Sequence, residues 1–162
     1  MPERRSARFG GHPLHPALVG LPIGLLTFSL AADVVRWLGG GTIWRELAFY
    51  TLGAGIAGAL IAAVPGFIDY LAITDVKVRD IALAHMATML AVVGIFAFSF
   101  WLRWIGTMGA LPAGVSALGL TLLGIGAWLG GEMVFVHGQG MSDPERTGDS
   151  RDETGSRRRR VA

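Results

Sequence analysis

Residues 17–38 read ALVGLPIGLLTFSLAADVVRWL, and this stretch decides the fold. Its length of about 22 residues corresponds to roughly 33 Å of α-helix, which is enough to cross the hydrocarbon layer of a bilayer. Three further apolar stretches of similar length follow, separated by short polar connections. The four predicted membrane spans are residues 17–38, 47–68, 81–105 and 111–136.

The composition agrees with this interpretation. Hydrophobic residues make up 52% of the 162 residues and charged residues only 16%, so a water-soluble fold could not bury this many apolar side chains. We therefore predict an all-α integral membrane four-helix bundle in contact with the lipid bilayer, formed by residues 1–137. Residues 138–162 are polar and charged and cannot form a core, so we expect a disordered cytoplasmic tail.

Two features of the composition exclude classes of function. The chain has no cysteine, which removes disulfides, thiolate nucleophiles and cysteine-held zinc or iron–sulfur sites. The sequence pI of about 9.7 reflects basic residues near both ends, including the run at 157–160. Beside membrane spans such basic segments favour anionic lipid, and we expect no nucleic-acid partner.

The distribution of lysine and arginine predicts the orientation, because cytoplasmic loops of membrane proteins are enriched in these residues. An even number of spans puts both termini and the 69–80 loop on one side. Only Arg36, Arg45 and Arg103 lie on the other side. We expect a multi-pass protein with both termini in the cytoplasm. The basic residues on the predicted cytoplasmic side, apart from the run at 157–160, are Arg4, Arg5, Arg8, Lys77, Arg79, Arg146 and Arg151.

Small residues four positions apart indicate where helices approach closely. Gly55 with Ala59 and Gly126 with Gly130 follow this spacing in the second and fourth spans. We therefore expect these two spans to be neighbours in the interior of the bundle.

Four distinctive features lie along the chain: GHPLHPALVGLPIG at 11–24, AVPGFIDYL at 63–71, His85 early in the third span, and WLGGEMVFVHG at 128–138. With them the chain resembles a bacterial family of predicted membrane proteins, domain of unknown function 2231. The resemblance implies the bacterial inner membrane as the location and leaves the biochemical role open. Some relatives are joined to Rieske iron–sulfur domains, which implies a redox partner such as a Rieske-type protein or a quinone.

All four histidines are predicted on the cytoplasmic side of the bundle. Imidazole is the usual protein ligand of haem and of several transition metals. His85 is the best candidate ligand, because it lies inside the third span, where a polar side chain normally has a partner. Its partner would be His137 or one of the amino-terminal pair, His12 and His15. The alternative for His85 is a structural hydrogen bond between helices.

The proline after each amino-terminal histidine favours an extended backbone at both His12 and His15. In that conformation the two residues lie roughly 9 Å apart, too far to hold one ion together. We expect one to be a ligand and the other to donate a hydrogen bond to a carboxylate or propionate. The other reading is that both bind loop carbonyls.

Two carboxylates, Glu132 and Asp69, are predicted at the same level as candidates to support the ligands. Glu132 and His137 cannot both face the bundle centre on a regular helix, unless the helix ends near residue 135. Asp69 has an alternative role in capping the second span or pairing with Lys77 or Arg79. On the opposite side, we expect Asp33 to form an ion pair near Arg36 or to lie at the interface.

The predicted function is a cofactor-binding, redox-associated membrane protein that holds haem b or a transition metal with its histidines. The alternative is a non-enzymatic membrane subunit or small carrier whose polar rim serves assembly or proton coupling, including as a homo-oligomer. A metal hydrolase is disfavoured because the chain has no H-E-x-x-H motif. We assign no catalytic residue, and the sequence favours a protein that is not a stand-alone enzyme.

Overall fold

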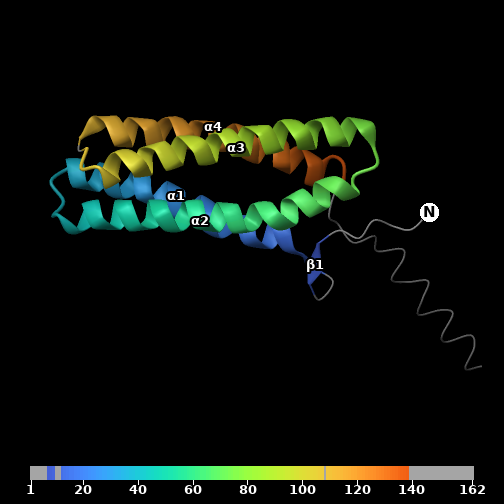
Figure 1. Ribbon diagram of the computed structural model, residues 1–162, viewed down its shortest axis with the longest axis horizontal. Helices are drawn as coiled ribbons and strands as arrows, with labels where there is room; N and C mark the ends of the chain where they lie inside the picture. Colours follow the sequence, from blue (N-terminus) through green and yellow to red (C-terminus); the bar gives the residue numbers. More distant parts are fainter. Residues whose placement is uncertain (1–6, 10–11, 108, 139–162) are drawn as a thin grey trace, which may run out of the picture.

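The computed structural model describes residues 7–9, 12–107 and 109–138, and four long helices dominate it (Figure 1). All four are long and apolar enough to cross a membrane. The predicted all-α membrane four-helix bundle is confirmed. The tail from residue 139 onward, predicted to be disordered, lies outside the described residues. The helices are α1 (Leu14–Trp37), α2 (Ile43–Ala72), α3 (Val76–Trp104) and α4 (Ala110–Phe135).

The segment before α1 is a minimal β-ladder in which β1 (Arg8–Phe9) pairs antiparallel with β2 (His12–Pro13). Helix α1 then begins at Leu14, three residues earlier than the apolar stretch begins. The expected extended conformation at His15 is therefore wrong, since His15 lies in the first helical turn. Pro16 is compatible with this position, because the first turn leaves backbone N–H groups unpaired in any case.

Short turns make consecutive helices antiparallel. Gly39 and Gly106 have φ values of 100° and 85°, which lie in the left-handed region that glycine tolerates best. At the start of α3, the side chain of Asp75 accepts hydrogen bonds from the amides of Lys77 and Val78 (2.9 and 3.1 Å) and caps the helix. The turn between α2 and α3 lies at the same end of the bundle as β1 and the start of α1 (Figure 1).

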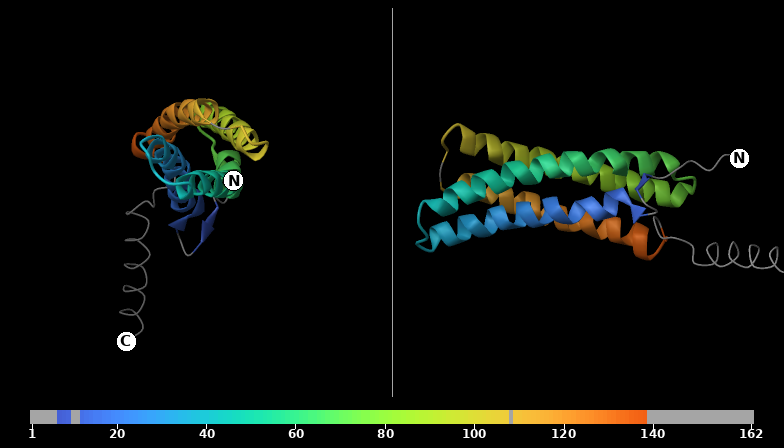
Figure 2. Two further views of the ribbon diagram at one scale, coloured as in Figure 1. Left: turned by 90° about the vertical axis from the view of Figure 1, so that its left-hand side faces the viewer. Right: turned by 90° about the horizontal axis from the view of Figure 1, so that it is seen from below.

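The bundle consists of two helical hairpins, α1–α2 and α3–α4, and each helix packs chiefly against its partner in the hairpin (Figure 2). The expectation that spans two and four are neighbours is wrong. A Cβ atom added at Gly55 of α2 would lie 2.8 Å from Leu26 of α1, and one at Gly119 of α4 would lie 3.2 Å from Phe96 of α3. The small residues thus allow close approach within each hairpin.

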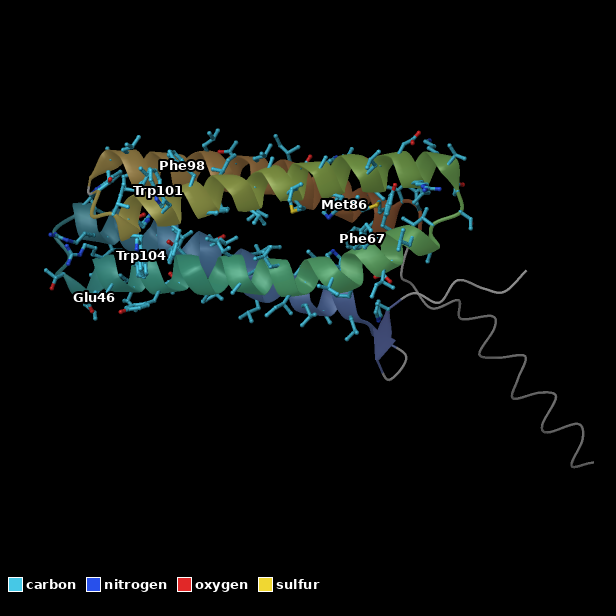
Figure 3. All side chains as sticks on the ribbon, viewed as in Figure 1. Glu46, Phe67, Met86, Phe98, Trp101 and Trp104 are labelled. Carbon is cyan, nitrogen blue, oxygen red and sulfur yellow. The ribbon has the colours of Figure 1, made fainter. Side chains whose placement is uncertain are left out.

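An apolar core joins the two hairpins midway along the bundle. Its members come from all four helices and are 0–6% exposed: Leu26, Leu52, Val92, Phe96 and Leu123. Many outward-facing apolar side chains remain exposed, as expected for helices that contact lipid. Trp101 and Trp104, which are 52% and 72% exposed, lie at the opposite end from Phe67 and Met86 (Figure 3). Indoles at one end suit the headgroup layer of a bilayer.

We expect the Gly55→Ala variant to lose about 1–3 kcal/mol of stability, because the added methyl group would lie 2.8 Å from the buried Leu26 side chain. Thermal unfolding in detergent measures the effect. Gly24→Ala is the matched control, since no atom lies within 4 Å of a Cβ at that site. Equal melting temperatures for the two variants would contradict the close packing of α1 on α2.

Candidate histidine site

Two of the four histidines meet between the hairpins. The rings of His15 on α1 and His85 on α3 lie with their centroids 6.4 Å apart and their planes at 83°. Both side chains are partly buried. The helices bring these residues together at the end of the bundle where α1 starts and α3 has completed its first turns. We call this the histidine end.

Each imidazole is held by a backbone carbonyl of the second helix of its hairpin. His15 Nδ1 lies 2.8 Å from the carbonyl oxygen of Ala62, and His85 Nδ1 lies 2.8 Å from that of Gly126. A carbonyl oxygen can only accept, so each Nδ1 carries a proton and donates it. In the neutral form of each ring, Nε2 is then the nitrogen that has the lone pair. This is how ligating histidines are usually oriented in proteins.

The rings lie directly against helix backbone because glycine faces each of them. A Cβ atom at Gly66 would lie 2.7 Å from His15 Nδ1, and one at Gly130 would lie 3.2 Å from His85 Cε1. Gly130 was predicted to allow close approach of helices, and Gly66 lies in the stretch AVPGFIDYL, for which no glycine role was predicted. Their absent side chains leave room for the two imidazoles.

Among the side chains that the structure describes, the other predicted site residues do not contact this pair. Helix α4 ends at Phe135, and His137 follows in a turn where its amide donates to the Glu132 carbonyl oxygen (3.3 Å). Within residues 7–9, 12–107 and 109–138, no hydrogen bond or ring contact links the side chains of His137 or Glu132 to His15 or His85. The backbone of His12 lies in β2, and its side chain lies outside the described residues.

Asp69 near the end of α2 binds the chain segment that precedes α1. Its Oδ1 accepts the amide of Ala7 at 2.7 Å, and the carbonyl of Ala7 in turn accepts the amide of Leu14 at 3.0 Å. The carboxylate therefore anchors the segment just before His15. Of the expected alternative partners, Arg79 has its guanidinium 5.6 Å from the ring centroid of Tyr70 instead.

We expect Asp69→Ala to speed hydrogen exchange of the Ala7 amide by about tenfold or more, because a hydrogen bond to a charged acceptor contributes about 1.5–3 kcal/mol. Hydrogen–deuterium exchange of the detergent-solubilised protein measures this effect. Asp75→Ala is the control, since it removes a cap at the start of α3 and leaves the Ala7 contact intact. Unchanged protection at Ala7 would contradict the anchoring role.

The donor set of the site is small. In the part of the chain that the structure describes, no group of three or more His, Asp or Glu residues could hold a metal ion. Structural and catalytic zinc sites normally use three or four protein ligands. A haem iron takes at most two axial ligands from the protein, and two imidazoles are a common pair. Among the described residues, the histidine end thus offers two imidazoles, which is the number of axial ligands that a haem iron can take from a protein.

A second polar cluster occupies the opposite end of the bundle. Asp33 of α1 forms an ion pair, as expected, and its partner is Arg103 of α3 rather than the nearby Arg36, with two contacts of 2.8 and 2.7 Å. The two side chains are 14% and 9% exposed. Arg103 also donates to Ser116 Oγ at 3.2 Å, while its buried Nε has no partner. Arg36 instead donates to the carbonyl of Gly40.

A protein-family model described as a predicted membrane protein, DUF2231, matches residues 11–143 of the chain. The match includes both histidines of the pair and all four helices. No curated protein and no solved structure matches the chain.

Proposed function

The chain belongs to the DUF2231 family of predicted membrane proteins, and from this premise we propose that it is a membrane redox protein in which His15 and His85 hold one haem b. The observation that carries the proposal is the pair of imidazoles, each with Nδ1 bound to a backbone carbonyl and Nε2 left with its lone pair.

The separation of the two rings supports a single iron between them. A bond between a metal and an imidazole nitrogen is about 2.0 Å long. Two imidazoles that each gave Nε2 to one iron would have ring centroids roughly 6 Å apart. The centroids of His15 and His85 are 6.4 Å apart. Gly66 and Gly130 add to the fit, because any side chain there would displace a ring.

A haem held by two imidazoles supplies one-electron transfer and has no open position for a substrate. The residues of this chain would then orient the ligands and exclude water. Ala62 and Gly126 fix the tautomer of each ring through their carbonyls. Asp69 anchors the segment next to His15, and the apolar core closes the site toward the middle of the bundle.

A single redox centre implies exchange of electrons with a partner at the same face of the membrane. All four histidines of the sequence lie toward the histidine end, so a second haem at the other end would have no imidazole ligand. The excess of lysine and arginine supports a cytoplasmic histidine end. The membrane that we propose is the bacterial inner membrane, which the resemblance to the family implies. A quinone or a Rieske-type protein is the proposed partner.

The carrier reading is less well supported. The core residues Leu26, Leu52, Val92, Phe96 and Leu123 separate the histidine end from the Asp33–Arg103 cluster, and a path for protons or solute within one chain would have to pass them. A closed apolar core between two polar ends fits a fixed redox centre better than a pathway.

The experiment that tests the proposal is the absorption spectrum of protein purified in detergent from haem-replete cells, oxidised and then reduced with dithionite. We expect a reduced haem spectrum and a pyridine haemochrome content of one haem per chain. Elemental analysis of the same sample detects any other metal. A colourless protein without iron would overturn the proposal and favour the non-enzymatic membrane subunit.

A further inference from the structure

The two hairpins make the same contacts in the same order, although their sequences look different. In each hairpin a histidine near the start of the first helix binds a carbonyl of the second helix. In each, a fully buried serine further along the first helix does the same at 2.7 Å. The matching pairs are His15–Ala62 with His85–Gly126 and Ser29–Ala48 with Ser99–Pro112.

A constant offset relates these contacts. Position n of α1 corresponds to position n + 70 of α3, as His15 does to His85 and Ser29 to Ser99. Position n of α2 corresponds to n + 64 of α4, since 48 matches 112 and 62 matches 126. The same offsets relate two further sets of close contacts, in each of which a glycine of the second helix lies against a side chain of the first helix. The matched contacts are Gly55–Leu26 with Gly119–Phe96, and Gly66–His15 with Gly130–His85.

Aligned in this register, the hairpins share ten identical residues, which include the histidine, the serine and both glycines of the matching contacts. The partners of these residues differ between the hairpins: Ala62 and Gly126, Ala48 and Pro112, and Leu26 and Phe96. The sequence therefore contains a two-helix repeat, and two repeats of parallel orientation are related by an axis along the bundle. The identical pairs are His15 and His85, Ala17 and Ala87, Gly24 and Gly94, Phe28 and Phe98, Ser29 and Ser99, Leu47 and Leu111, Gly55 and Gly119, Ile61 and Ile125, Ala63 and Ala127, and Gly66 and Gly130.

Two contacts locate the axis. In a two-fold arrangement a residue meets its own equivalent only where the axis passes. His15 meets His85 at one end of the bundle, and Asp33 meets Arg103 at the other, and both pairs obey the offset of 70. The pseudo-two-fold axis therefore runs lengthwise between the two hairpins, which lie on opposite sides of the bundle in the end-on view of Figure 2.

Identical residues can face each other at the histidine end, because each imidazole binds a carbonyl of its own hairpin. At the other end, identical charges would repel inside a bundle where the side chains are only 14% and 9% exposed. Here the two repeats carry opposite charges. We propose that the Asp33–Arg103 ion pair determines how the hairpins associate. It favours packing of an α1–α2 hairpin against an α3–α4 hairpin. It disfavours packing of two α1–α2 hairpins from two copies of the chain, because two Asp33 side chains would then face each other.

The proposal is independent of haem binding and makes a prediction about reversing the charges. Because positions 33 and 103 are equivalent, the pair should function in either order. The surroundings of the pair differ between the repeats: Arg103 donates to Ser116, which also shares a 2.8 Å hydrogen bond with Ser99, and the position equivalent to Ser116 in the first hairpin is the buried Leu52. A faithful reversal thus combines Asp33→Arg and Arg103→Asp with Leu52→Ser and Ser116→Leu.

The test compares three variants of the full chain in detergent: the fourfold reversal, Asp33→Arg alone, and an apolar pair made by Asp33→Leu with Arg103→Met. Melting temperature, or yield in membranes where a variant does not survive purification, reports stability. Light scattering after gel filtration reports mass.

We expect Asp33→Arg to lower the melting temperature by about 10 °C and the reversal to recover most of that loss. The apolar pair should stay as stable as wild type, since replacing a buried ion pair by apolar residues is often neutral, but should form additional species of roughly twice the wild-type mass. A reversal no more stable than Asp33→Arg, or an apolar pair with the wild-type mass distribution, would overturn the proposal.

Discussion

His85→Ala, purified from haem-replete cells, is expected to hold less than about a tenth of the haem bound by the wild-type protein. Even residues that only support a metal ligand contribute roughly 10- to 100-fold to affinity, and a lost ligand should cost at least as much. His15→Ala should show the same loss, because the two rings are equivalent in their carbonyl contacts. The ratio of Soret to protein absorbance measures the effect.

His137→Ala is the matched control. Its side chain contacts neither His15 nor His85 in the described part of the chain, so it should retain haem at the wild-type level. Melting temperatures of the apo proteins show whether a variant has lost its fold as well as its ligand. Loss of haem in His137→Ala with retention in His15→Ala would mean that the pair is the wrong one.

A methyl group at Gly66 is expected to lower haem occupancy by about tenfold or more while leaving the helices intact. The added Cβ would lie 2.7 Å from His15 Nδ1, and the ring would have to leave its hydrogen bond to Ala62. The misplaced ring could no longer hold Nε2 in position. Absorbance at the Soret band measures occupancy, and circular dichroism measures helix content.

Gly58→Ala controls for adding a methyl group to the same helix, because its Cβ would meet Pro22 at an ordinary contact distance of 3.5 Å. Full haem occupancy in Gly66→Ala would contradict the requirement for His15 in its observed position. Equal loss of haem in Gly58→Ala would show that general packing of α2, rather than the histidine, controls binding.

The helices could be predicted from the sequence because their cause is local. Long apolar stretches give the four spans, and glycine and polar residues end them. The helix bounds differ mainly at the histidine end, where α1 begins at Leu14 and α2 continues to Ala72. Pro16 suggested an extended chain, yet proline is well accommodated in a first helical turn.

The pairing of side chains could not be predicted because it depends on contacts between distant residues. Among several partners for His85, the sequence offered no reason to prefer His15. The bond of Asp69 to a backbone amide leaves no sequence pattern. Asp33 and Arg103 are 70 residues apart, and the nearer Arg36 was the more obvious partner. The repeat became visible only through the shared register of contacts, since its identical residues are widely spaced.

The electron paramagnetic resonance spectrum of the oxidised protein tests the central claim most directly, because it reports the axial ligands of a haem iron. We predict a low-spin ferric signal from the wild-type protein, a change to high spin in His15→Gly reconstituted with haem, and a return to low spin when imidazole is added. A high-spin wild-type signal, a His15→Gly spectrum unchanged from wild type, or the absence of haem iron would contradict the account.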